Sequence, residues 1–235
     1  MTDLEFALAL ADQADALTVA RFRAADLRIE TKPDLTPVTD ADRAVERALR
    51  ERVAAERPGE GVFGEEEGGT SAEVRWIIDP IDGTRNFARG IPVWATLIAL
   101  DRDGSIECGV VSAPTLGRRW WAERGGGAWR DDGERLRVSS VGALRDATVS
   151  CSLAKDYVVL EPLVWHVRGF GDFWQHVLVA EGSLDACVDA KLSLWDWAAV
   201  SPIVTEAGGR LGQVDGQIIS SNGLVHDEMV AALSR

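Results

Sequence analysis

The chain has 235 residues, of which 46% are hydrophobic, enough for the core of one compact domain or of two lobes that share an interface. Its formal net charge of −13 argues against nucleic acid as a partner, because binding to a phosphate backbone needs clustered Lys and Arg. The three widely spaced cysteines and the three histidines fit neither a disulfide framework nor a tetrahedral zinc site, so we expect the cysteines in the core of a cytoplasmic protein.

The amino-terminal part predicts two helices separated by an extended segment. Residues 1–22 carry acidic groups where a signal peptide needs positive charge, and their apolar residues recur at helical spacing. Pro33 and Pro37 keep the following segment extended, and Thr39 or Asp40 can cap a second helix. Every apolar run falls short of the roughly 20 residues that a membrane span requires, so we expect no membrane partner.

The middle of the chain predicts strands. RWIIDP is typical of a buried strand that ends at Pro80 in a turn. Residues 94–129 form short apolar or alternating runs broken by DRDG, SAPTLG and ERGGG, which predicts antiparallel hairpins, and residues 136–138 predict one more strand. Trp120 and Trp121 are adjacent on one of these strands, so we expect one indole to face outward and to mark a homodimer interface.

The last third alternates strands and helices. DATVSCS and LDACVDA predict strands, whereas GDFWQHVLVAEG and WDWAAVSPIVTEAGG predict helices, the second kinked by Pro202. We therefore expect two α/β lobes, residues 1–139 and 140–235, with a cleft between them.

The segment D-P-I-D-G-T at residues 79–84 is the strongest local signal of chemistry. A rigid proline turn can aim the carboxylates of Asp79 and Asp82 and the Ile81 carbonyl at one point, and hard cations prefer such an all-oxygen shell. Gly83 allows close approach of a ligand, and a helix beginning at Thr84 would present free N–H groups to an anion such as phosphate. For the hexapeptide alone, an ordinary Asp-Gly turn is nearly as good an interpretation.

Two further acidic segments are candidates for the same site. In GEEEGG, Glu65 follows a glycine and is the preferred ligand, because the crowded carboxylates need a countercharge, whereas Glu66 and Glu67 are expected in a solvated loop. Asp196 precedes an apolar helical pattern, where it can cap the helix, bind a metal, or do both with different oxygens.

Together, GEE, WIIDPIDGTRNF and WDWAAVSPIVTEAGG resemble the three sequence blocks of the inositol monophosphatase superfamily of Mg²⁺- and Li⁺-sensitive phosphatases. TKPDLTPVTDADRAVE, GIPVWATLIAL and SNGLVHDE are most similar to its histidinol-phosphate phosphatases of actinobacterial type. The resemblance implies a layered αβαβα sandwich of two lobes with the active site between them, a homodimer, and a small-molecule phosphate ester as substrate. Such relatives are longer than this chain, and we expect this chain to have shorter loops than they do near residues 71–73, 155–160 and 215–219.

The resemblance also implies a set of metal ligands. Glu65, Asp79 and the Ile81 carbonyl correspond to the ligands of one Mg²⁺, and Asp79, Asp82 and Asp196 to those of a second. A third, weaker Mg²⁺ near Glu65 gives two to three ions per site. The first lobe would then carry most ligands, and the second would carry Asp196 and the substrate-selecting residues.

Catalytic roles follow from the same resemblance. Gly83 and Thr84 would contact the phosphate, and Asp82 and Asp196 would also face the substrate. Asp42 would pair with the Thr84 hydroxyl to accept the proton of the attacking water, with Glu65 as the third catalytic residue.

Three residues are candidates for substrate selection. Asp189 occupies the family position that contacts the alcohol, where a carboxylate suits an ammonium group or a pair of inositol hydroxyls. Asp172 adds a second acid for a cationic substrate, and Arg168 can orient Asp172 or touch the phosphate. A surface or interlobe ion pair is an equally good interpretation of Asp172 and Arg168.

Several alternatives stay open. Haloacid dehalogenase phosphatases carry D-x-D-G-T, but here the position two residues before Asp82 is Pro80, which favours direct attack by water over an aspartyl nucleophile. A metal-binding regulatory protein on the same fold is the alternative outside enzymes. Among phosphatases, inositol 1-phosphate, fructose 1,6-bisphosphate and 3′-phosphoadenosine nucleotides are alternative substrates, because specificity lies in variable loops.

Overall fold

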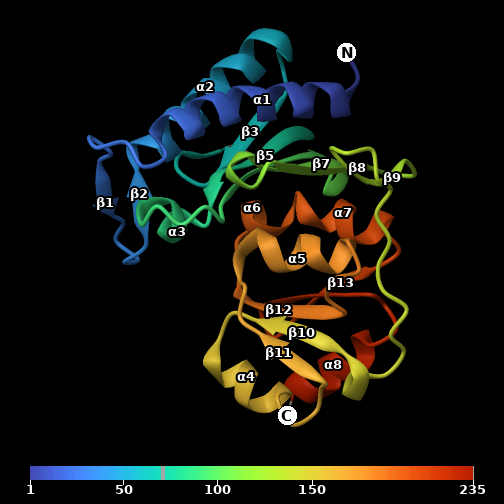
Figure 1. The fold of residues 1–235 in the computed structure, drawn as a ribbon. Helices are drawn as coiled ribbons and strands as arrows, with labels where there is room; N and C mark the ends of the chain where they lie inside the picture. The colour runs from blue at the N-terminus through green and yellow to red at the C-terminus, as the bar shows by residue number, and fades with distance from the viewer. Residues whose placement is uncertain (70–71, 235) are drawn as a thin grey trace.

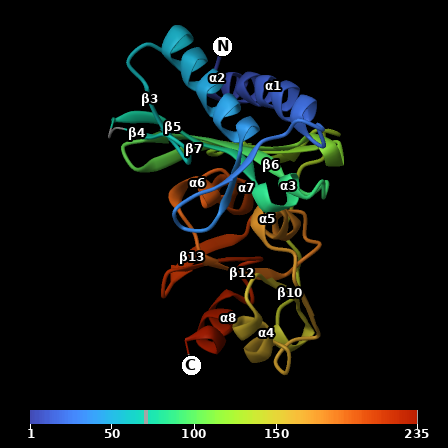
Figure 2. The same cartoon turned by 90° about the vertical axis from the view of Figure 1, so that its left-hand side faces the viewer.

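The computed structural model describes residues 1–69 and 72–234 and arranges them in five layers (Figure 1). Helices α1 (Asp3–Arg21) and α2 (Asp40–Glu56) cover one face of a seven-stranded sheet, and α5 (Asp172–Ala180), α6 (Leu194–Trp197) and α7 (Val200–Glu206) pack on its other face. A five-stranded sheet lies below these three helices, with α4 (Ala154–Leu160) and α8 (His226–Leu233) on its far side (Figure 2). This order confirms the predicted αβαβα sandwich.

The seven-stranded sheet has the order β4-β3-β5-β6-β7-β8-β9 and is antiparallel except where β3 pairs with β5. Its strands are β3 (Gly61–Gly64), β4 (Gly68–Gly69), β5 (Val74–Asp82), β6 (Ala95–Arg102), β7 (Ser105–Ala113), β8 (Arg118–Glu123) and β9 (Gly127–Arg130). Strands β6 to β9 confirm the predicted hairpins, which bring sequence neighbours together and leave the carboxyl end of β5 facing α6.

The five-stranded sheet has the order β11-β10-β12-β14-β13, with β10 parallel to both of its neighbours. Its strands are β10 (Thr148–Cys151), β11 (His166–Arg168), β12 (Ala186–Lys191), β13 (Arg210–Val214) and β14 (Gln217–Ser221). The remaining elements are the hairpin β1 (Ile29–Thr31) and β2 (Pro37–Thr39), the short helix α3 (Thr84–Ala88), and the 3₁₀ turns η1 (Pro114–Leu116) and η2 (Leu144–Asp146).

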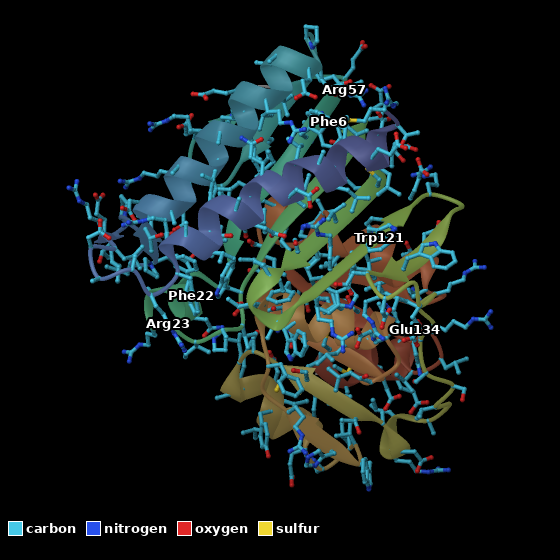
Figure 3. All side chains as sticks on the ribbon, turned by 45° about the horizontal axis from the view of Figure 1, so that its top comes forward. Phe6, Phe22, Arg23, Arg57, Trp121 and Glu134 are labelled. Carbon is cyan, nitrogen blue, oxygen red and sulfur yellow. The ribbon has the colours of Figure 1, made fainter. Side chains whose placement is uncertain are left out.

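Helix α1 begins at a capping box and packs its apolar face on the sheet. The Thr2 hydroxyl accepts from Glu5 N at 3.1 Å, and the Glu5 carboxylate accepts from Thr2 N at 2.7 Å, so two otherwise unpaired N–H groups are satisfied. Phe6 is buried one turn later, and Arg57 from the end of α2 stacks its guanidinium 4.9 Å from the Phe6 ring centroid (Figure 3). These contacts hold α1 and α2 as one layer over β5 to β7.

Three sequence-based expectations are wrong. Residues 136–138 form no strand, because this stretch instead bridges the two halves through single hydrogen bonds such as Val138 N to Ala207 O. Strand β5 continues past Pro80 to Asp82 through a bulge. Neither indole of the Trp pair stands free: Trp120 is 1% exposed below the sheet, and Trp121 is partly buried beside α1 on the opposite face (Figure 3).

Pro202 has a structural explanation. The predicted helix is split into α6 and α7, with the break at residues 198 and 199 just before Pro202. This break lies against Gly109 of β7, where an added Cβ would collide with the Ala199 carbonyl and approach Pro202 Cγ to 2.8 Å. The glycine therefore lets the interrupted helix pack directly on the sheet backbone, which fixes the position of α6.

The described residues also locate the other expected features. Helix α4 covers residues 155–160, and Asp215 and Gly216 form the turn between β13 and β14, whereas residue 71 of the first expected short loop, residues 71–73, lies outside the description. All three cysteines are buried free thiols, as predicted. Among residues 1–69 and 72–234, no helix is long and apolar enough to cross a membrane. The division into lobes at residue 139 stays a prediction.

Candidate active site

Three carboxylates meet where the carboxyl end of β5 faces α6. Asp79 and Asp82 belong to β5 and Asp196 to the first turn of α6, and an oxygen of each lies within 4.8 Å of the others. Residues three apart in a regular strand point to opposite faces, so the two β5 carboxylates can converge only because the pairing with β6 slips between them. The bulge is held by Thr96 Oγ1, which donates to the Pro80 carbonyl at 2.8 Å.

Asp79 is the most enclosed member of this cluster. Its side chain is buried, and its Oδ1 accepts a hydrogen bond from Ile81 N at 3.0 Å. Burial, followed by the charges of Glu65, Asp82 and Asp196, raises the pKa of Asp79 well above its usual range. Ionised carboxylates this close together are stable only with a cation between them.

Asp196 combines a capping role with a free oxygen. Ser193, not Asp196, is the N-cap of α6, and Ser193 N donates to Asp196 Oδ2 at 2.6 Å in a capping box. Burial, together with the neighbouring charges of Glu65, Asp189 and Asp172, raises the pKa of Asp196 to about 7 despite this hydrogen bond. The Asp196 carboxylate thus completes the capping box of α6 and also belongs to the cluster, but the predicted N-cap position of Asp196 is wrong.

The turn that carries Glu65 is held by a buried carboxylate from α2. Glu46 is fully buried and accepts from Glu66 N at 2.7 Å and from Glu67 N at 3.0 Å, while Arg50 Nε donates to the same carboxylate at 2.9 Å. A Cβ at Gly64 would collide with the Glu46 carboxylate, so only glycine permits this approach. The Glu46–Arg50 pair therefore positions the acidic turn.

Lys32 supplies a countercharge to this turn. Its Nζ lies 2.8 Å from Glu65 Oε1 and 2.6 Å from Glu66 Oε1, reaching over from the end of β1. The Glu66 side chain is 7% exposed, so the expected solvated position of Glu66 is wrong, and burial raises its pKa to about 7 even beside Lys32. Glu67, at 47%, is solvated as expected.

Asp42 and Thr84 face each other across the site. Thr84 Oγ1 lies 3.4 Å from Asp42 Oδ1 and 2.9 Å from the Ile81 carbonyl oxygen, so its hydroxyl proton has two acceptors within reach. The other oxygen of Asp42 accepts from both the backbone N–H and the hydroxyl of Thr39 at the start of α2. Burial raises the pKa of Asp42 to about 6, in spite of these bonds.

Gly83 provides the turn from β5 into α3. It adopts a left-handed conformation with φ of +83°, and a Cβ there would lie 3.1 Å from the Val93 carbonyl oxygen. Helix α3 begins at Thr84, as predicted, and its first residues, Thr84 and Arg85, line the cavity together with Gly83.

Two more carboxylates extend the acidic region beyond the three-carboxylate cluster. Asp172, in a left-handed conformation with φ of +52°, places Oδ2 3.4 Å from Asn86 Nδ2, and burial with the charge of Asp189 raises its pKa to about 6. Asp189 is 5% exposed and accepts from Gln175 Nε2 at 2.7 Å. Its pKa is lowered because contacts with His176 and with neighbouring donors outweigh the effect of burial.

A cavity of about 410 Å³ is lined by Asp172, but not by Asp189 or by the three converging carboxylates. Its wall combines the β1–β2 hairpin, the acidic turn, the start of α3 and the loop before α5; it is lined by Thr36, Pro37, Glu65, Gly83, Thr84, Arg85, Asn86, Cys151, Ser152, Gly169, Phe170, Gly171 and Asp172. Arg168 ends β11 with an exposed side chain, next to the wall residues Gly169 and Phe170. Arg85, which sequence reasoning missed, is the cation whose charge opposes the rise in the Asp172 pKa.

The donor set fits a hard divalent cation. All of the converging groups offer oxygen, and none is a thiol or an imidazole, which is the ligand chemistry of Mg²⁺ rather than Zn²⁺. Burial and the charges of Glu65, Asp82 and Asp196 raise the pKa of Asp79, and a bound cation would oppose both effects.

Comparison with known proteins agrees with this chemistry. The family model described as "Inositol monophosphatase family" matches residues 2–234. The chain belongs to the inositol monophosphatase family. It is therefore a phosphomonoester hydrolase of a metal-dependent family, and the haloacid dehalogenase and regulatory-protein alternatives are wrong.

Individual family members are similar over nearly their whole length. A histidinol-phosphatase of Mycobacterium tuberculosis is 52% identical, covering 99% of this chain and 98% of the relative, and one of Streptomyces coelicolor is 46% identical, covering 100% and 98%. Among solved structures, an IMPase of Thermotoga maritima superposes with a TM-score of 0.92 at 32% identity, covering 100% of this chain and 97% of that one.

Removal of divalent cations should make the folded enzyme less stable as the pH rises. Asp196, with a pKa raised from 3.8 to about 7, and Asp172, raised to about 6, stay protonated in the folded state over a pH range in which the unfolded chain has released these protons. The free energy of unfolding therefore falls between about pH 4 and pH 7. We expect a lower Tm at pH 7.5 than at pH 5.5 in EDTA, and a smaller difference in saturating Mg²⁺. A Tm in EDTA that rises over this interval would contradict the electrostatic description.

Proposed function

We propose that this enzyme hydrolyses L-histidinol phosphate to L-histidinol and phosphate by direct attack of water. Relatives that carry the name histidinol-phosphatase are 40–52% identical over at least 96% of their own length, whereas inositol-1-monophosphatases are 33–37% identical. Identity alone does not select a substrate, so the proposal depends on the groups that would face the leaving alcohol.

The observation that carries the proposal is the second acidic pair, Asp172 and Asp189. Asp172 lines the cavity, and its Oδ2 is 3.4 Å from the position that a Cβ on Gly83 would take. The charge of Asp189, on strand β12, raises the pKa of Asp172. Of the two, Asp172 lines the cavity and would offer its negative charge to the leaving alcohol directly, whereas the buried Asp189 would act through its charge. An amino alcohol brings an ammonium group that would pair with them and keep Asp172 ionised.

Two to three Mg²⁺ ions are the cofactor that we infer for this site. Glu65, Asp79 and the Ile81 carbonyl would hold one ion, and Asp79, Asp82 and Asp196 a second. Bound there, Mg²⁺ supplies a lowered pKa for the attacking water and positive charge for the phosphate and the leaving oxygen. Phe173 N, which donates to Asp82 Oδ2 at 2.5 Å, keeps the Asp82 carboxylate oriented from α5.

The protein groups around the phosphate would bind it and receive the proton of the water. Gly83 and Thr84 present backbone N–H groups at the start of α3, which suits a phosphate oxygen. The Thr84 hydroxyl would accept a hydrogen bond from the water and donate to Asp42, whose pKa of about 6 suits a proton acceptor near neutral pH. When the bond between phosphorus and the ester oxygen breaks, the leaving oxygen takes up a proton from solvent water, so the products are the alcohol and phosphate.

The proposal is tested by phosphate release from four esters: L-histidinol phosphate, inositol 1-phosphate, fructose 1,6-bisphosphate and a 3′-phosphoadenosine nucleotide, each with Mg²⁺ and with EDTA. We expect kcat/KM for histidinol phosphate to exceed the others at least about tenfold and to be lost in EDTA. Wild-type preference for another ester would refute the substrate assignment and retain the hydrolytic mechanism.

Asp172→Asn and Asp189→Asn connect this preference to the acidic pair. Each should lower kcat/KM for histidinol phosphate by at least about tenfold, because losing one partner of a buried charge pair costs about 2 kcal/mol or more. Turnover of inositol 1-phosphate should change much less, and Glu161→Gln, on the exposed end of α4, should change neither. Equal losses for both esters would show that the pair supports the site generally.

Other features of the enzyme are inferred from the family resemblance. We infer a homodimer in the cytoplasm, with the metal ligands divided between lobes 1–139 and 140–235. Arg168, exposed at the end of β11, would approach the phosphate or Asp172 only after its side chain turns toward the cavity.

A further inference from the structure

The catalytic cavity continues into an apolar hollow. A second depression of about 320 Å³ is lined by Cys151, Ser152, Leu153, Ala154, Tyr157 and Val158, at the end of β10 and along the first turns of α4. Cys151 and Ser152 also line the catalytic cavity, so the two spaces adjoin. Glu65, Thr84 and Asp172 line the catalytic cavity but not the hollow.

Aromatic side chains stand exposed at this junction. Phe170 lines the catalytic cavity and is 43% exposed, and Tyr157 lines the hollow and is 46% exposed. The backbone of Phe170 is fixed, because Phe170 N donates to Ser150 Oγ at 3.1 Å and Ser150 is fully buried in β10. Large apolar side chains held in water beside a catalytic cavity gain contact area when a ligand covers them.

Ser152 is a polar group at the junction that is already engaged. Its Oγ accepts a hydrogen bond from Ala190 N at 3.1 Å, and its hydroxyl is hydrogen-bonded to the Asp189 carboxylate. The ring of a ligand would therefore be held by its contacts with Phe170 and Tyr157.

The groups around the two spaces match the chemistry of one class of leaving alcohol. Thr84 and Asp172 line the catalytic cavity together with Phe170, and Tyr157 lines the adjoining hollow. An amino alcohol phosphate with a heteroaromatic ring carries one group for each: the ester, the ammonium one carbon away, and the ring. A polyhydroxy ester such as inositol phosphate has no group for the apolar part.

We propose that the hollow lined by Tyr157, together with Phe170 in the adjoining wall of the catalytic cavity, is the subsite for the heteroaromatic ring of the leaving alcohol. The inference rests on the proposed function, since it takes an amino alcohol phosphate as the substrate class. It adds residues outside the metal cluster that decide which amino alcohol is accepted. The subsite acts by covering the ring on binding, so it contributes to KM rather than to the chemical step.

The test compares two amino alcohol phosphates that differ only in the ring, L-histidinol phosphate and L-alaninol phosphate. We expect Phe170→Ala to raise KM for histidinol phosphate about tenfold, in keeping with a lost aromatic contact and its buried area, and to raise KM for alaninol phosphate much less. Phe170→Tyr should restore the wild-type ratio, and Tyr157→Ala should reduce it in the same direction.

Trp165→Ala is the matched control, because Trp165 is an equally large aromatic that is 73% exposed and lines neither space. It should leave the ratio between the two esters unchanged. Equal effects of Phe170→Ala on both esters would overturn the subsite. So would a change in particle mass without a change in the ratio, which would assign the aromatic surface to a contact between subunits.

Failure of the proposed function would be seen separately. It would appear in the wild-type enzyme as preference for inositol 1-phosphate over both amino alcohol esters. The ratio between these two esters in Phe170→Ala, in contrast, tests the ring subsite alone.

Discussion

Asp79→Asn should lower kcat at least about 10³-fold and should at the same time stabilise the metal-free protein. The two effects have one cause. The Asp79 carboxylate is buried beside three other acids, and its pKa is raised well above the usual value, so its charge is costly unless a cation is bound. Asparagine keeps the shape and an acceptor oxygen for Ile81 N, which now donates at 3.0 Å, but removes the charge.

Phosphate release in saturating Mg²⁺ and thermal unfolding in EDTA measure the two effects. Asp146→Asn is the control, since the Asp146 side chain is 64% exposed in η2, far along the chain from the cluster. Its kcat and Tm should match those of the wild type. If Asp79→Asn retained more than a tenth of kcat, or had a lower Tm in EDTA, the Asp79 charge would be neither essential for catalysis nor costly in the metal-free protein.

Sequence could predict the part of the site whose residues lie close together in the chain, because their spacing determines their geometry. Asp79, Pro80 and Asp82 lie within one short motif, so their convergence needs only a kink in a single strand, and the structure provides that kink as a bulge in β5. Asp196 is 117 residues from Asp79, and no spacing rule connects them. Its assignment came from the family resemblance, and the structure brings its carboxylate to the cluster through the packing of α6 against β5.

The features that sequence reasoning missed depend on which face a neighbouring layer covers. Glu46 and Arg50 are spaced like an ordinary surface pair on a helix, and only the docking of the acidic turn on α2 buries Glu46. Trp121 alternates outward from Trp120 as strand periodicity requires, but α1 covers that outer face. Lys32 reaches Glu65 through the fold of the β1–β2 hairpin, which the proline spacing predicts only as extended chain.

Glu46→Ala should lower the free energy of unfolding by about 3 kcal/mol and should also reduce kcat, although Glu46 does not line the cavity. The change leaves Arg50 without its buried partner and the N–H groups of Glu66 and Glu67 without their acceptor. The acidic turn then loses the contact that fixes Glu65. Denaturant unfolding measures the first effect and phosphate release the second.

Glu46→Gln separates the two contributions, because the amide keeps an acceptor for the turn but loses the charge that pairs with Arg50. We expect it to retain more of kcat than Glu46→Ala at a similar loss of stability. Glu51→Ala, on the exposed face of the same helix, should stay within about 0.5 kcal/mol of the wild type. If Glu46→Ala lost stability but kept full kcat over the whole Mg²⁺ range, the turn would be held by Lys32 and β3 alone, and the sequence position of Glu65 beside Gly64 would suffice to place it.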